Sequence, residues 1–188
     1  MVVIGASVVV AAVVATIIMP PNPYSKPGIG ADGFQAFMEK DTDLGIGSVV
    51  SKDEVVAVLG KNAKSVENVS VSGVFNYNGD RGQTATYKFV RADGRQASLY
   101  VDVMVFKSSN SMDDANIYVG TGEAKVVNGH QAYYMHAQTL GITREYRVMV
   151  VNGLKAYKFV IDQPFDDITI NEVSSVAALL KLAQNAKL

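Results

Sequence analysis

Alternating apolar and polar positions, the pattern of a half-buried β-strand, dominate residues 144–161. Two runs rich in valine and aromatic residues flank Asn152–Gly153 there, and such a pair is the strongest short-range signal for a β-hairpin. With Asn152–Gly153 as the turn, Arg147 is predicted to face Lys158. One face gathers Tyr146, Val148, Val150, Tyr157, Phe159 and Ile161, and the other carries Glu145, Arg147, Met149 and Lys158 and is predicted to be mostly wet.

Earlier segments repeat the strand pattern. In the pair of strands around Asp93–Gly94 neither face is cleanly polar, so either both faces are covered there or the register is off by one residue. The predicted strands are one long strand over 66–77, a hairpin of 84–91 with 95–106, and a hairpin of 123–127 with 130–137 around Asn128–Gly129.

Helix signals lie on both sides of these strands. Ser51 with Glu54 is a capping box, and the helix that it starts is predicted to end near Gly60. Thr169 with Glu172 is a second capping box, which opens a helix running to about residue 186. A short helix over 34–39 and a helical turn over 111–115 are also predicted, and the buried stripe expected for the last helix is Val173, Val176, Ala177, Leu180 and Ala183.

These elements predict one α+β domain over residues 49–188. We expect an antiparallel meander of five to seven strands with an N-terminal and a C-terminal helix packed on one face.

The first residues follow a different pattern. Residues 2–19 form an uncharged apolar run about 27 Å long as a helix, close to the ~30 Å core of a bilayer. We therefore interpret residues 1–19 as a membrane anchor or a cleaved signal peptide, with a buried β-branched strand as the third alternative. The missing Lys or Arg before the run counts against both membrane interpretations. Residues 20–48, rich in proline and glycine at their start, are predicted to be a linker.

Composition narrows the chemistry. The net charge of -1 lacks the basic excess of nucleic-acid binders, and the absence of cysteine excludes disulfides and thiolate catalysis. His130 and His136 are predicted to lie about 20 Å apart on one strand, too far to share a metal ion. No serine lies in a nucleophile elbow, and the glycines of 28–33 follow a proline-rich stretch rather than a strand, which argues against a nucleotide site. The acidic pairs are Asp41 with Asp43 and Asp166 with Asp167, and neither continues into a calcium-binding loop.

The order of elements resembles a known group of proteins. The helix at 50–60, the antiparallel sheet, the segment 127–133 and the closing helix look like the small envelope lipoproteins of actinobacteria, whose function is unassigned. The resemblance covers about residues 50–186 and implies an α+β domain exposed at the cell surface. The chain departs from that family because it has no lipidated cysteine.

We therefore expect an extracytoplasmic binding module, tethered through residues 2–19 or secreted, without a cofactor. Its partner is predicted to be an envelope protein, a polymer or a small apolar ligand held between sheet and helices. An enzyme with a site assembled from scattered residues is the alternative. Like charges facing each other across a hairpin need a compensating group, which is either Glu145 on the same face or an anionic partner. If it is a partner, Arg147, Lys158 and Glu145 are the candidate contacts.

Overall fold

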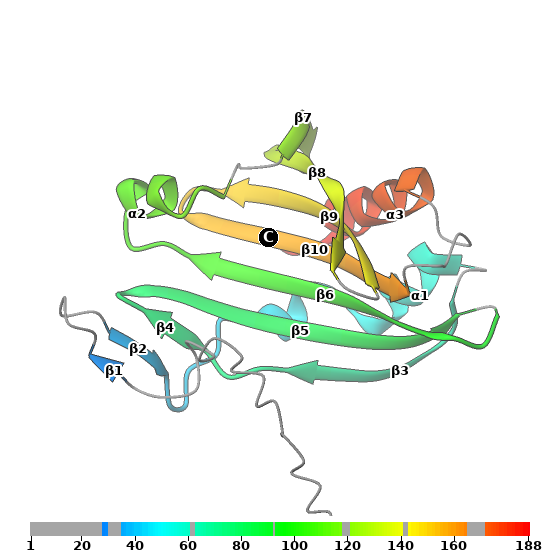
Figure 1. Ribbon diagram of the computed structural model, residues 1–188, viewed down its shortest axis with the longest axis horizontal. Coiled ribbons are helices and arrows are strands. Elements are labelled where there is room, and N and C mark those ends of the chain that lie inside the picture. The colour runs from blue at the N-terminus through cyan, green and yellow to red at the C-terminus, as the bar shows by residue number, and fades with distance from the viewer. Residues whose placement is uncertain are drawn as a thin grey trace, which may run out of the picture.

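The computed structural model describes residues 28–29, 35–60, 63–91, 93–117, 121–140, 143–164 and 172–188. One antiparallel sheet forms the main layer, and α1 (Lys52–Leu59) and α3 (Glu172–Asn185) lie on the same face of it (Figure 1). The strands are β1 (Gly28–Ile29), β2 (Gln35–Met38), β3 (Ala63–Val71), β4 (Phe75–Tyr77), β5 (Asp80–Arg91), β6 (Gln96–Val105), β7 (Thr121–Val127), β8 (His130–Leu140), β9 (Thr143–Asn152) and β10 (Lys155–Pro164). The remaining helices are η1 (Ile46–Ser48) and α2 (Ser109–Asp114).

The α+β class is as predicted, but the sheet has ten strands, and the expectation of five to seven is wrong. The strand order is β1-β2-β4-β5-β6-β10-β9-β8-β7, with β3 also paired to β5. Two meanders, one ending at β6 and one at β10, therefore meet in the middle of the sheet. The connection through α2 carries the chain from β6 to the opposite edge at β7 (Figure 1).

Two local errors account for much of the difference in strand number. Residues 35–38 form β2 instead of a helix, because pairing with β1 and β4 gives a short segment more hydrogen bonds than a single helical turn does. The long strand predicted over 66–77 is interrupted at residues 72–74 and becomes β3 and β4, which both pair with β5.

The main core fills the space between the sheet and the helices. Phe159 and Ile161 of β10 and Leu179 of α3 are fully buried there. The Tyr87 hydroxyl donates to the Val50 carbonyl oxygen at 2.5 Å, which ties β5 to the start of α1. Burial raises the pKa of Tyr87. This hydrogen bond and the buried side chains hold the sheet and α1 together as one layer pair.

The β9–β10 hairpin confirms the predicted apolar face and corrects its register. All six of its apolar side chains are buried. Asn152 pairs with Lys155, so the turn is Gly153–Leu154, with glycine at φ +58° in the first central position. Because the pairing slips by two residues, each side chain keeps its face. Its partner changes, however: Arg147 faces Val160 rather than Lys158.

Two further corrections concern β5–β6 and α3. Tyr87 faces Leu99, so the predicted register of that hairpin was off by one residue, and Tyr87, Phe89, Leu99 and Val101 share the buried face. In α3 the predicted stripe is wrong at Val173, which is 80% exposed, and at Ala177, which is also exposed. Nearly every side of this helix carries apolar residues, so periodicity could not select one stripe. The residues that α3 buries are Ser175, Leu179, Leu182 and Ala183.

Candidate functional site

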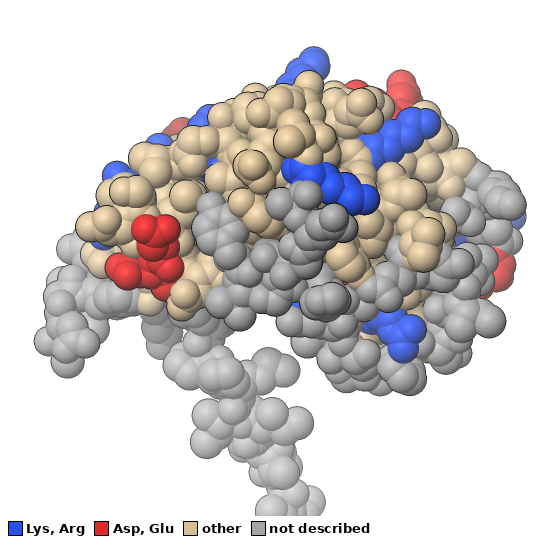
Figure 2. Space-filling view, turned by 90° about the horizontal axis from the view of Figure 1, so that it is seen from above, with Lys and Arg blue, Asp and Glu red and all other residues tan. Residues whose placement is uncertain are grey.

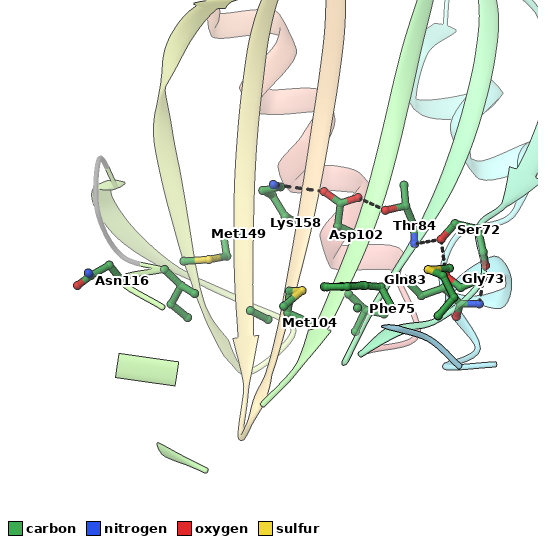
Figure 3. Close-up of a pocket in the computed structure, with 15 residues that line it drawn as sticks. Ser72, Gly73, Phe75, Gln83, Thr84, Asp102, Met104, Asn116, Met149 and Lys158 are labelled. Carbon is green, nitrogen blue, oxygen red and sulfur yellow. Dashed lines mark hydrogen bonds and ion pairs between the residues drawn. The ribbon is translucent and has the colours of Figure 1, made fainter. Parts of the chain in front are cut away.

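A groove of ≈ 570 Å³ lies on the face of the sheet opposite α1 and α3, which we call the outer face. Strand alternation and register bring Thr84, Asp102 and Lys158 side by side across β5, β6 and β10. Figure 3 shows these side chains in front of the strands, with α3 behind. The lining residues are Met38, Ser72, Gly73, Phe75, Gly82, Gln83, Thr84, Asp102, Val103, Met104, Asn116, Ile117, Met149, Ala156 and Lys158.

Methionine side chains lie over glycines in this groove. A Cβ atom on Gly82 would be 2.8 Å from the Met104 sulfur, and one on Gly73 would be 2.7 Å from the Met38 methyl carbon. The two glycines therefore let the methionines lie against bare backbone. Methionine is unbranched and flexible, so such a lining can adjust to ligands of different shape.

A second apolar cluster borders the groove. Met149, Ala156 and Phe106 are buried in it, and Met104 and Ile117 pack against them. The face that carries Met149 was predicted to be mostly wet, and this expectation is wrong near β9 and β10, where Met149 is only 3% exposed. The outer face is therefore partly hydrophobic beside the groove.

Three polar side chains, Thr84, Asp102 and Lys158, interrupt the apolar lining of the groove (Figure 3). The Thr84 hydroxyl donates to one oxygen of Asp102 at 2.7 Å, and the Lys158 Nζ atom lies 3.3 Å from the other. The Thr84 backbone N–H in turn donates to the Ser72 hydroxyl at 3.0 Å. Gln83 supports this end of the groove, since its amide donates to the Ser72 carbonyl oxygen at 3.1 Å. The carboxylate is thus held from both sides by donors.

The predicted contact residues divide between two places. Lys158 lines the groove and faces Met149 across β9, so its predicted opposition to Arg147 is wrong. The Arg147 Nε atom lies 3.8 Å from a Glu145 oxygen, farther along the outer face. Burial, partly offset by Arg147, raises the pKa of Glu145, and burial also raises the pKa of Asp162 opposite it. Only Lys158 of the three predicted residues belongs to the groove.

Sequence reasoning missed Asp102 and Thr84. Their proximity to Lys158 depends on the pairing of β6 with β10, strands separated by about fifty residues of chain. The available signal was local: Asp102 is the single charged residue of its strand, between two valines.

The candidate metal ligands do not come together within the described residues, where no group of three His, Cys, Asp or Glu side chains could hold a metal ion. The Asp43 carboxylate accepts the Gly45 N–H at 2.8 Å, an ordinary turn contact. The side chain of His136, most of the segment 28–33 and both Asp166 and Asp167 lie outside what the structure describes.

Of the described helices, none is long and apolar enough to cross a membrane, and residues 2–19 lie outside the described part. Figure 2 shows the charged side chains of one face scattered rather than gathered into a continuous basic surface. Protein-family models, curated proteins and solved structures give no match to the chain. The fold and groove thus define a class, an α+β domain with a ligand-sized hollow on its sheet.

Proposed function

We propose that the chain is a non-enzymatic binding module whose outer-face groove takes a small, mainly apolar ligand. The groove carries this proposal, since its volume of ≈ 570 Å³ falls in the range of small-molecule sites, about 300–1,000 Å³. Such sites combine an apolar lining with a few placed polar groups, as the methionines and the Asp102–Lys158 pair do here.

The composition of the groove favours binding over catalysis. Its titratable side chains are Asp102 and Lys158, and they neutralise each other. The Thr84 hydroxyl donates a hydrogen bond to Asp102, whose carboxylate is also paired with the Lys158 ammonium group. A carboxylate stabilised in this way is a weak base toward a hydroxyl, so a carrier or sensor of an apolar molecule fits the lining better.

A neutral apolar dye tests this function. We expect N-phenyl-1-naphthylamine to bind the full chain and to gain fluorescence. Ala156→Phe should fill the groove and weaken binding at least about tenfold. Ala57→Phe, on the exposed side of α1, is the matched control and should bind as the unmodified protein does. No binding by the unmodified protein, or equal binding by folded Ala156→Phe protein, would contradict the proposal.

The proposed location is outside the cytoplasm, with residues 2–19 as a tether or a signal. Their length and lack of charge support this part of the proposal. Fractionation of the tagged chain, followed by protease treatment of intact cells, tests it. The domain should be digested from outside, and a chain lacking residues 2–19 should stay in the cytoplasm. Recovery of the full chain in the cytoplasm would overturn the location while leaving the groove untouched.

A further inference from the structure

The ion pair in the groove determines which polar end a ligand can carry. Asp102 is 26% exposed and Lys158 41% exposed, so both contact the hollow. Each Asp102 oxygen already has a donor, Thr84 at 2.7 Å and Lys158 at 3.3 Å. The ammonium group of Lys158 keeps further N–H bonds to offer, because it carries three donors.

Apolar side chains flank this pair along its own strands. On β10 the neighbours of Lys158 on the outer face are Ala156 and Val160, which are 5% and 3% exposed. On β6 the corresponding neighbours of Asp102 are Met104 and Tyr100. Charged residues follow on the same face: Arg147 faces Val160, and Glu145 faces Asp162. Glu145 interacts electrostatically with both Lys158 and Asp102. Among the described lining residues, Asp102 and Lys158 are the only charged ones, and their charges cancel.

We infer that the ligand is an uncharged amphiphile, with an apolar chain and a hydroxyl or ester end that accepts a hydrogen bond from Lys158. A ligand carboxylate at hydrogen-bond distance from Lys158 would lie within about 6 Å of Asp102, where like charges repel. A neutral oxygen meets no such repulsion, and a hydroxyl can also donate to Asp102. This inference rests on the proposed function and specifies the chemistry of its ligand.

Competition against the bound dye tests the inference with ligands of equal chain length. We compare dodecanol and monolaurin with laurate at about pH 8, where the laurate carboxyl is ionised. The neutral ligands should displace the dye from the unmodified protein at concentrations at least about tenfold lower than laurate does. Equal displacement, preference for laurate, or displacement by none of the three would overturn the inference.

Removal of the Asp102 charge should reverse the preference for neutral ligands over laurate. Asp102→Asn leaves Lys158 without a counter-charge, so laurate should bind at least about fivefold more tightly than it binds the unmodified protein. Lys158→Met should weaken laurate binding below that of the unmodified protein. Lys155→Met, exposed outside the groove, is the matched control. An unchanged preference in folded Asp102→Asn protein would overturn the inference. Failure of the unmodified protein to bind the dye would instead overturn the proposed function, so the two failures are distinguishable.

Discussion

At the scale of single residues, Glu145 and Asp162 show how burial on the outer face makes the stability of the fold depend on pH. They face each other on β9 and β10, and burial raises the pKa of both carboxyls in the folded chain. A raised pKa means that the folded state binds more protons than the unfolded state, so stability falls as pH rises through this window. Below the ordinary carboxyl pKa of about 4 both states are protonated and the effect disappears.

Asp162→Asn should therefore stabilise the fold at neutral pH. We expect its free energy of unfolding to exceed that of the unmodified protein near pH 7 and the difference to vanish near about pH 3. Urea unfolding at a series of pH values measures this. Asp93→Asn serves as a comparison of opposite sign, because the Arg95 backbone N–H lowers the pKa of Asp93. A destabilised Asp162→Asn protein at neutral pH would contradict the assignment.

The capping box of α1 is a second effect of single residues. The Ser51 hydroxyl accepts the Glu54 N–H at 3.2 Å, and the Glu54 carboxylate accepts the Ser51 N–H at 2.7 Å. We expect Ser51→Ala to lower the free energy of unfolding by about 1 kcal/mol. Ser70→Ala, on an exposed position of β3, should change it by less than about 0.5 kcal/mol. Urea unfolding of both variants decides, and equal effects would show that the cap adds nothing.

At the scale of elements, two similar sequences form different turns. Residues 126–133 and 150–157 share Val-Val-Asn-Gly and Ala-Tyr, yet Asn128–Gly129 is the first turn and Gly153–Leu154 the second. Ala132 consequently packs in the main core, whereas Ala156 packs in the cluster of the outer face. Sequence predicted both hairpins but not this difference, since the register of β10 is also fixed by its pairing with β6.

The two turns should respond differently to loss of the asparagine. Asn128 has φ +54°, and its side chain approaches the Ala186 carbonyl oxygen at 3.4 Å, so Asn128→Ala should cost about 1–2 kcal/mol. Asn152 lies in the strand and has no positive φ, so Asn152→Ala should cost less than about 0.5 kcal/mol. Thermal or urea unfolding compares the pair. A larger loss at Asn152 would place the second turn where the sequence alone put it.

The final helix gives another element-scale test. Leu179 is fully buried against the sheet, and Leu179→Ala should cost about 2–5 kcal/mol. Val173, which the sequence placed in the buried stripe, is 80% exposed, and Val173→Ala should cost less than about 0.5 kcal/mol. Comparable losses at both positions, measured by urea unfolding, would restore the stripe predicted from periodicity.

At the scale of the whole molecule, the sequence predicted the class and the local pieces but not their assembly. Alternation identified most hairpins, because one face of each strand is buried and the other is not. It could not place β6 beside β10, and the groove depends on that junction, where Asp102 meets Lys158. Local patterns also assigned residues 35–38 to a helix in a linker, although they pair within the sheet. Long-range pairing thus decided both the topology and the candidate site.

The described fold also predicts that the N-terminal segment can be removed without loss of the domain. Every described strand and helix begins at Gly28 or later, so deletion of residues 1–27 removes none of the described pairings or core contacts. We expect the shortened chain to keep its far-UV circular dichroism and its groove, with a Tm within about 4 °C of the full chain in the same detergent. A fall in Tm of about 10 °C or loss of dye binding would mean that residues 1–27 form part of the folded domain. The buried-strand interpretation of residues 2–19 would then replace the tether, because an apolar strand removed from a sheet exposes its neighbours, whereas a membrane anchor does not stabilise the domain it holds.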